Sequence, residues 1–494
     1  MGEPENEGRL VRLVHWFDSR LGLSYQLLRP VPQYAINPFY WLGALAVVAF
    51  VIQGITGMVM MLYYVPSPTQ AYTSTLYIFQ NVYFGAFLQT VHLYTAYAMI
   101  MLAFMHLMRG YFVSVHKKPR ELMWVTGMLM GFVTLGFGFT GYLLPWSVIS
   151  KSATDVGVGM IQALPPPVSS FVSFLIVGVG GDAATLLRFY DLHVVILPAV
   201  LLALLVVKMY MLETHGISEP ALGDGPSFRS KKLLPVFPDV SLYLLELAAL
   251  FGVGMLLISF LFPVTLPPAY TPQLAATIAA QPDWYFLWIY QILKISAFEG
   301  GGLPVALTLV TGVLLLLVVL PFIDRSERRR ISERPRFIAI GAIFAAELVV
   351  LAGWGLLTPG QGIPTLQATL VLGGTALAVG LIVLGVARAL RSRVRTPDAL
   401  AGAAIRTAQL RVGLAMTGII ALGALSIGVS MDSVVQLALN GLKLFPLARL
   451  VASLIGLAAS AFLSIFLIFR LHSGADLMRR RLIFLRIGWN DAED

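Results

Sequence analysis

The chain has 494 residues, of which 58% are hydrophobic and only 12% charged, and its formal net charge is +9. These few polar residues cannot cover a water-soluble globule of this length, which excludes a soluble enzyme and predicts a membrane protein. The chain has no cysteine, which excludes disulfides, thiolate-held iron–sulfur clusters and covalently attached c-type heme within it. Any redox cofactor must therefore rest on nitrogen ligands.

Apolar stretches set the expected fold. A membrane span needs about 20 mostly apolar residues, and such stretches are centred near residues 50, 98, 135, 200, 251, 312, 347, 378, 421 and 459. The sequence therefore predicts an all-α fold, a polytopic membrane bundle of about ten transmembrane helices.

The basic residues have a topological rather than a nucleic-acid-binding explanation. If the N-terminus is cytoplasmic and each span crosses once, nearly all of them fall on the cytoplasmic side. The opposite loops contain little beyond Lys151, Lys294, Lys443 and Arg449. This is the positive-inside distribution. We therefore expect a multi-pass protein of the plasma membrane with a cytoplasmic N-terminus, in contact with membrane lipid and with no nucleic acid.

In chain order, the sequence divides into four predicted domains. They are an amphipathic N-terminal segment (1–36), a four-helix bundle (37–221), a second group of four spans (222–390), and two additional spans with a basic tail (391–494). The four spans of the bundle are expected at about 38–64, 83–113, 124–146 and 186–212, and they contain every membrane-embedded histidine. A cofactor is therefore expected in this bundle.

Three histidines form the candidate cofactor site. His92 and His106 lie fourteen residues apart in one apolar span, which places them on nearly the same helix face, about 21 Å apart along the axis. His193 lies near the external end of the fourth span. A single buried histidine is as easily structural, hydrogen-bonded to a neighbouring carbonyl. The stacked pair with a third histidine opposite favours two hemes at different depths.

Glycines support this interpretation. Gly43 and Gly57 on the first span and Gly127 and Gly141 on the third repeat the interval of fourteen residues. Positions without a side chain would let a flat porphyrin edge approach the backbone. Small-residue helix packing is the alternative explanation, and the register shared with the histidines argues against it.

Together these residues resemble the cytochrome b subunit of quinol-oxidising cytochrome bc-type complexes. The similarity covers about residues 30–390 and includes the stretch from His92 to Arg109-Gly110, Gly141-Tyr-Leu-Leu-Pro-Trp146, Thr185 to His193, and Pro282-Asp283-Trp284-Tyr285. It implies that residues 37–221 bind heme and that residues 222–390 are the C-terminal domain, which carries the quinol-site loop. The two terminal spans fall outside the eight that are common in the family.

The resemblance also implies the ligands of heme b. His92 and His193 would ligate the outer, lower-potential heme, and His106 would be one ligand of the inner heme. Arg109 and Arg188 match arginines that face heme propionates. Ordinary anchoring at a helix end is the alternative for Arg109.

Lys208 stands where the resemblance places a histidine, fifteen residues after His193. Three interpretations are open. Lys208 ligates the inner iron as a neutral amine, or it extends to the cytoplasmic surface and leaves the inner heme five-coordinate on His106, or the inner heme is absent. The set of implied metal ligands is therefore His92, His193, His106 and Lys208.

The motif Pro282-Asp283-Trp284-Tyr285 implies a quinol-oxidation site, where Asp283 is the candidate proton acceptor and the segment from Pro145 and Trp146 to Ala153 forms the facing wall. By itself, the motif is also consistent with a helix start capped by Asp283 beside an aromatic interface belt. The family cycle implies a Rieske iron–sulfur protein partner, a homodimer within a larger respiratory complex, and quinone reduction near Glu213, His215 and Asp239.

Two other classes remain as alternatives. A diheme membrane anchor of another oxidoreductase would relay electrons without a Rieske partner and without the Pro282–Tyr285 loop. A non-redox transporter would bind a solute through midplane polar residues and show no visible absorption.

Overall fold

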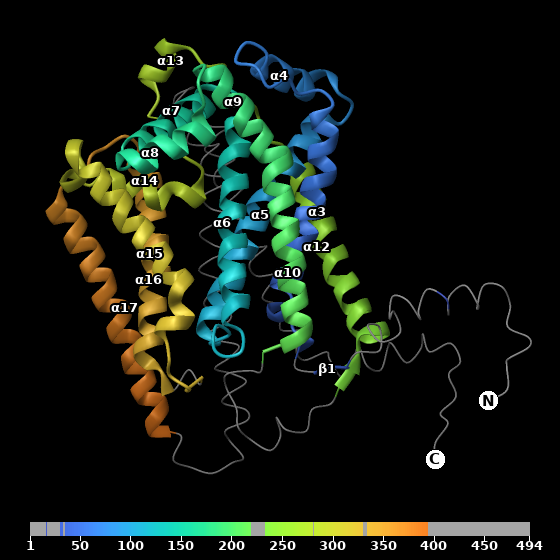
Figure 1. Cartoon of the computed structure of the whole chain (residues 1–494), viewed down its shortest axis with the longest axis vertical. Helices are drawn as coiled ribbons and strands as arrows, with labels where there is room; N and C mark the ends of the chain where they lie inside the picture. Colours follow the sequence, from blue (N-terminus) through green and yellow to red (C-terminus); the bar gives the residue numbers. More distant parts are fainter. Residues whose placement is uncertain are drawn as a thin grey trace, which may run out of the picture. The chain divides into compact units, whose positions relative to one another are not determined.

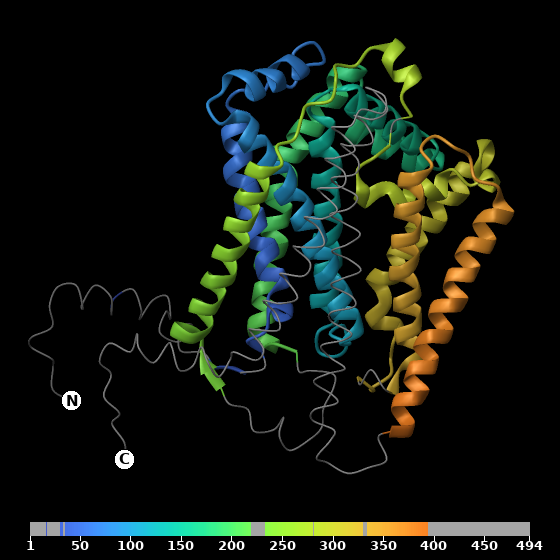
Figure 2. The same cartoon turned by 180° about the vertical axis from the view of Figure 1, so that it is seen from behind.

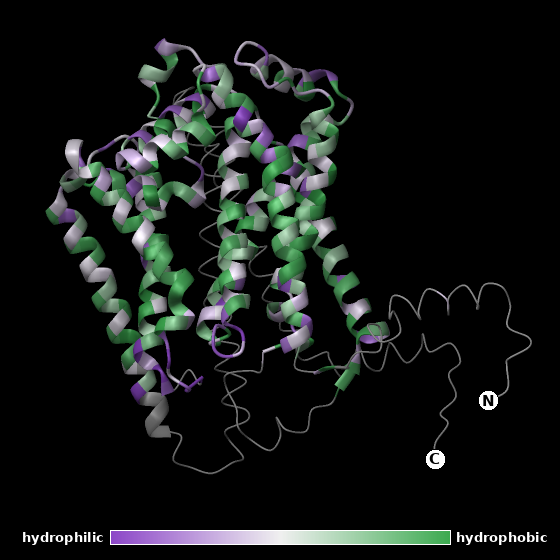
Figure 3. Cartoon of the chain, viewed as in Figure 1, coloured by the Kyte–Doolittle hydropathy of each residue, from purple (hydrophilic) through white to green (hydrophobic). Residues whose placement is uncertain are grey.

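The computed structural model describes residues 16, 30–32, 35–218, 233–279, 281–329 and 333–393. Within these residues, eight helical segments are long and apolar enough to cross a membrane, and Figure 3 shows hydrophobic residues along the helices and hydrophilic residues gathered at their ends. The predicted all-α membrane fold is confirmed. The last two expected spans lie outside the described residues.

The spans agree with the predicted positions to within a few residues. They are α3 (Leu42–Met61), α5 (Gly85–Phe112), α6 (Glu121–Leu143), α9 with η4 and α10 (Asp182–Asp191, Leu192–Ile196 and Leu197–His215), η5 with α12 (Val236–Val240 and Ser241–Leu261), η8 with α15 (Gly300–Gly302 and Leu303–Ile323), α16 (Pro335–Leu357) and α17 (Thr365–Arg393). Helices α3, α5, α6 and α10 form the predicted four-helix bundle, and α12 packs on α5.

Short elements connect the spans. They are η2 (Pro38–Tyr40), α4 (Ala71–Asn81), α7 (Val148–Gln162), α8 (Pro166–Val172), η3 (Ser173–Val177), α13 (Pro272–Thr277), η6 (Trp284–Phe286), α14 (Leu287–Leu293), η7 (Ser296–Phe298), and the antiparallel strands β1 (Pro30–Pro32) and β2 (Leu233–Pro235). Figure 1 shows α4, α7, α9 and α13 gathered at one end of the bundle, and β1 lies at the other end.

The chain divides into two compact units. The first comprises Met1–Gln281, Ile292–Ala345 and Gly360–Arg388, and the second comprises Pro282–Gln291, Ala346–Pro359 and Ala389–Asp494. All the predicted heme ligands belong to the first unit, and the Pro282–Tyr285 motif belongs to the second.

The fourth span contains a π-helical turn at a predicted ligand. His193 lies in this turn, η4, between α9 and α10. Pro198 follows at the start of α10, and because proline has no N–H it cannot continue the α-helical hydrogen bonding to the residue four positions back. A π turn takes up one extra residue. The fifteen residues from His193 to Lys208 therefore connect two levels on this span, as the fourteen residues from His92 to His106 do on α5.

The segment after α12 is tied to the start of α7. Val148 N–H donates to the carbonyl of Pro268 at 2.9 Å, and Ser147 forms a bridge with Ala269. Figure 2 shows this segment running along the end of the bundle toward α13. Lys151 holds the same region through ion pairs with Asp155 and Asp182, at 2.5 and 3.4 Å.

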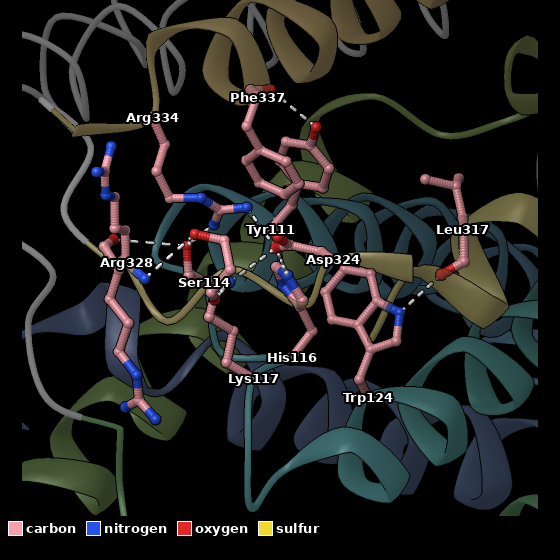
Figure 4. Close-up of polar contacts among 12 residues, drawn as sticks. Tyr111, Ser114, His116, Lys117, Trp124, Leu317, Asp324, Arg328, Arg334 and Phe337 are labelled. Atoms are coloured by element: carbon pink, nitrogen blue, oxygen red, sulfur yellow. Dashed lines mark hydrogen bonds and ion pairs between the residues drawn. The ribbon is translucent and has the colours of Figure 1, made fainter. Parts of the chain in front are cut away.

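A buried polar cluster joins the α5–α6 loop to the α15–α16 loop (Figure 4). We call it the Asp324 cluster; its members are Ser114, His116, Lys117, Asp324 and Arg334. The carboxylate of Asp324 accepts from His116 Nε2 at 2.7 Å and pairs with Lys117 Nζ at 3.1 Å and with Arg334. Arg334 also donates to Ser114. One carboxylate thus pairs with two buried cations.

The Asp324 cluster is expected to weaken in acid. Burial lowers the pKa of His116, and its hydrogen bond with Asp324 offsets only part of this effect. Burial raises the pKa of Asp324, but hydrogen bonds from His116 and Lys117 and the charge of Arg334 outweigh burial and leave that pKa below its usual value. Both groups bind protons less readily in the folded chain than in the unfolded one. Their stabilising contribution is complete above the ordinary pKa values of 6.5 and 3.8 and is lost as the pH falls through the lowered ones.

We expect Asp324→Asn to destabilise the protein by about 3–5 kcal/mol, because it leaves Lys117 and Arg334 buried without their counter-charge. Thermal unfolding of the purified protein in lipid nanodiscs measures the change. Asp155→Asn is the control, since the Asp155 side chain is 53% exposed and its ion pair is expected to contribute less than about 1 kcal/mol. Equal stability losses in the two variants would contradict this account.

Candidate functional site

Each of the four predicted glycines lies against one of the four predicted ligands. A Cβ atom would lie 3.3 Å from the His106 ring at Gly43, 3.3 Å from the His92 ring at Gly57, 2.6 Å from the His193 ring at Gly141, and 2.7 Å from Lys208 Nζ at Gly127. Any larger side chain at these positions would crowd the group that faces it. The intervals of fourteen residues on α3, α5 and α6, and of fifteen across the π turn of the fourth span, therefore bring glycines and predicted ligands together at two heights in the bundle.

His92 and His193 form the outer pair. Their ring centroids are 6.3 Å apart and the ring planes are inclined by 65°. An iron atom held between two imidazole nitrogens by bonds of about 2 Å separates the ring centroids by roughly 6 Å. The two side chains therefore fit the two axial positions of one heme.

Threonine hydroxyls fix the tautomer of both outer histidines. Thr56 Oγ1 lies 2.8 Å from His92 Nδ1, and Thr140 Oγ1 lies 3.0 Å from His193 Nδ1. Each hydroxyl donates its single proton to a carbonyl of its own helix, so its oxygen accepts from Nδ1–H. The lone pair of each ring is then on Nε2, as a metal ligand requires. This proton position is assigned from the hydrogen bonds.

His106 and Lys208 occupy the inner level. Lys208 Nζ faces Gly127 as the His193 ring faces Gly141. Thr126 precedes Gly127 just as Thr140 precedes Gly141, and its hydroxyl donates to Leu122 O at 2.8 Å. Lys208 therefore has a glycine beside it that directly follows a threonine, as His193 has.

An apolar layer separates the two levels. Ala49, Met99 and Leu201 are buried there, with Phe50 and Phe137 packed against them. Met99 is seven residues from both His92 and His106, so the layer lies about 10 Å along the helix from each. The outer and the inner groups of predicted ligands are therefore separated by apolar side chains.

The two predicted propionate arginines have different surroundings. The guanidinium of Arg109 lies 3.9 Å from the ring centroid of Tyr40, near the inner level. Arg188 lies at the α9 end of the fourth span, where it donates to Phe174 O and lies against Gly178. Its guanidinium is therefore already engaged by the α8–η3 segment in this structure.

The Pro282–Tyr285 motif is ordered within the second unit. Tyr285 is buried and its hydroxyl donates to Asp283 Oδ2 at 3.1 Å. Trp284 packs on the cluster of Leu287 and Ala352. Asp283 precedes η6, but no hydrogen bond from its side chain caps this turn. The carboxylate is therefore oriented by Tyr285 rather than used as a helix cap.

Sequence reasoning missed the two threonines and the π turn. Thr56 and Thr140 each directly precede a predicted glycine, and this adjacency was the available signal. A signal for the π turn was present in Pro198 and in the interval of fifteen residues from His193 to Lys208, one more than the interval of fourteen on α5. Gln53, which donates to His92 O at 2.5 Å, had no signal of its own.

The fold and the site define a class: a multi-pass membrane protein whose helical bundle holds three histidines and a lysine against four glycines at two levels. Two family profiles match the chain. One is described as cytochrome b/b6/petB and matches residues 28–216, and the other is described as cytochrome b(C-terminal)/b6/petD and matches residues 268–372.

Curated relatives and a solved structure agree with these profiles. The chain is 34% identical to the cytochrome bc complex cytochrome b subunit of Chlorobaculum thiosulfatiphilum over 70% of this chain and 81% of the relative. It is 32% identical to cytochrome b of Sulfolobus acidocaldarius over 74% and 69%, respectively. A chain of a hyperthermophilic respiratory Complex III aligns with a TM-score of 0.61 at 28% identity, over 74% of this chain and 97% of that one.

This chain belongs to the cytochrome b family. It is a membrane electron-transfer subunit of the cytochrome bc type, and members of this family bind heme b. The resemblance inferred from the histidine, glycine and Pro-Asp-Trp-Tyr motifs is confirmed.

Proposed function

We propose that this chain oxidises quinol at the external face of the plasma membrane. Quinol loses two electrons and two protons to become quinone. One electron passes to a Rieske iron–sulfur protein and the other passes through two stacked hemes b toward the inner face, while the protons leave outward and contribute to the proton-motive force. The observation that carries this proposal is the pairing of four ligands with four glycines at two heights.

His92, His193, His106 and Lys208 are the residues that would hold the hemes. When bound, each heme supplies a one-electron carrier. His92 and His193 present Nε2 to the outer position, and Gly57 and Gly141 leave room for the flat ring.

Lys208 is proposed as the second ligand of the inner heme, opposite His106. Two observations support it. Nζ of Lys208 faces Gly127, and this contact corresponds to the contact of the His193 ring with Gly141. A protonated amine has no lone pair, so ligation requires that Lys208 lose its proton when the heme binds. A metal centre favours this loss, because its positive charge opposes a second one nearby.

Asp283 is proposed as the acceptor of a quinol proton, within the motif Pro282-Asp283-Trp284-Tyr285. The hydroxyl of Tyr285 donates to Oδ2, which orients the carboxylate. The aromatic residues of the motif provide an apolar surface for a quinol ring. A proton taken up by Asp283 would then pass to the external medium.

We expect Asp283→Asn to slow quinol oxidation by about 10²–10⁴-fold, because the amide cannot accept the proton. Steady-state turnover of the assembled complex with a quinol substrate measures the effect. Both heme spectra are expected to stay unchanged. Asp283→Glu keeps a carboxylate and is the matched control, expected to retain most of the activity. Normal turnover in Asp283→Asn would place the proton acceptor elsewhere.

The remaining parts of the proposal concern topology and partners. The N-terminus is placed in the cytoplasm, the complex is a homodimer that includes the Rieske protein, and a second quinone is reduced near Glu213, His215 and Asp239. The basic loops support this orientation, since Lys117 and Arg334 of the Asp324 cluster come together from two loops at the same end of the helices. Labelling of single cysteines introduced at residue 118 and at residue 160, in intact cells, tests this orientation.

A further inference from the structure

Two threonine hydroxyls bracket the outer histidine pair, one on each side. Thr56 on α3 contacts His92 of α5, and Thr140 on α6 contacts His193 of the fourth span, at 2.8 and 3.0 Å. We propose that these hydroxyls act as positioning groups that lower the reduction potential of the outer heme. This inference rests on the proposed function, which places a heme between His92 and His193.

The direction of both hydrogen bonds follows from the helix carbonyls. Thr56 Oγ1 lies 2.7 Å from Ile52 O, and Thr140 Oγ1 lies 2.8 Å from Gly136 O. A hydroxyl has one proton, and a carbonyl can only accept. The proton therefore points along each threonine's own helix, and the oxygen lone pair is left to accept the Nδ1–H of histidine.

This arrangement makes both imidazoles stronger ligands. A hydrogen bond donated from Nδ1–H shifts electron density toward Nε2 and raises its basicity, and it also fixes the ring orientation. A more basic axial ligand stabilises ferric iron more than ferrous iron, since the ferric ion has the higher charge. The equilibrium between the two states then shifts toward the oxidised form, which is a lower reduction potential.

The inner level has no matching pair of hydroxyls. Leu42 stands directly before Gly43, where Thr56 stands before Gly57, and His106 Nδ1 has no hydrogen-bond partner among the described residues. Thr126 stands before Gly127, but the group across from it is the amine of Lys208. The hydroxyls therefore lower the potential at the outer level alone. This difference favours electron flow from the outer position to the inner one.

The test is a potentiometric titration of the assembled complex carrying Thr56→Val and Thr140→Val, singly and together. Valine has nearly the shape of threonine and has no hydroxyl. At a fixed ambient potential, the ratio of reduced to oxidised outer heme is expected to rise about tenfold in the double variant, which is 59 mV for one electron. Each single variant is expected to give about half this shift. The inner heme is expected not to change.

Thr134→Val is the matched control. Thr134 is also buried on α6 and donates to the carbonyl four residues back, Met130 O, at 2.9 Å. Among the residues that the structure describes, no hydrogen bond joins it to a histidine. It is expected to leave both potentials unchanged, and the Ser variants at residues 56 and 140, which keep the hydroxyl, are expected to restore the native potential.

An unshifted outer potential in the single and double variants overturns the inference. A shift as large in Thr134→Val also overturns it, because the effect would then be one of helix packing. These results differ from a failure of the proposed function, in which the unmodified protein itself would carry no heme between His92 and His193. Since each single variant keeps one of the two hydroxyls, its titration decides the matter even if the double variant assembles poorly.

Discussion

His193→Ala is expected to abolish heme binding at the outer level and to reduce quinol oxidation to background. The ring of His193 faces that of His92 at a centroid distance of 6.3 Å, and in this geometry one iron needs a nitrogen from each side. Alanine in place of His193 also leaves the space beside Gly141 unfilled. Heme extraction and a reduced-minus-oxidised spectrum measure the loss, and the inner signal is expected to remain.

His215→Ala is the control for this variant. His215 ends α10 and contacts none of the four glycines, so its loss is expected to leave both heme signals intact. If His193→Ala kept the spectrum and the heme content of the unmodified protein, the outer site could not be where we place it.

Lys208→Ala is expected to remove the inner heme signal or to convert it to a five-coordinate form, while the outer signal stays. The reason is that Nζ of Lys208 faces Gly127 at the same relative position as the His193 ring at Gly141. Electron transfer from the outer level would then have no inner acceptor. Quinol oxidation under multiple turnovers is expected to fall by about 10-fold or more. Spectra of the inner heme before and after reduction measure the change.

Two substitutions separate ligation from charge. Lys208→His supplies an imidazole beside Gly127 and Thr126 and is expected to retain a six-coordinate inner heme. Lys208→Arg keeps the positive charge, but a guanidinium is not deprotonated in proteins and has no lone pair for iron. Lys208→Arg is therefore expected to give the same inner-heme spectrum as Lys208→Ala. An unchanged inner spectrum in Lys208→Ala would rule out ligation by this residue.

The spans and the two levels of histidine, lysine and glycine residues could be predicted because they depend on local, periodic signals. Apolar length locates a membrane helix, and α3, α5 and α6 begin and end within about four residues of the expected positions. The intervals of fourteen residues place His92 and His106 on one helix face by helix geometry alone. Equal intervals on α3, α5 and α6 also give equal heights for their glycines and histidines, whereas the fourth span needs its π turn to match them.

The contacts between distant segments could not be predicted in this way. His116 contacts Asp324 although 208 residues separate them. Neither loop has a sequence pattern that predicts contact with the other. The strands β1 and β2 pair across more than 200 residues and were not expected. Thr56 and Thr140 were overlooked because threonine is common in membrane helices, where its hydroxyl usually satisfies a carbonyl of its own helix.

The local backbone explains one further difference. Arg188 was expected to face a heme propionate, and in the structure its guanidinium donates to Phe174 O. The sequence placed the residue on the correct helix but carried no information on the return of the α8–η3 segment toward it. The role of Arg188 toward a heme stays a prediction.

Heme content and the reduced-minus-oxidised spectrum of the purified protein, expressed with ample heme supply, test the central claim most directly. The account predicts two noncovalently held b-type hemes per chain, one of them with the spectrum of bis-histidine ligation. A colourless protein, or one whose heme shows no bis-histidine signature, would contradict it.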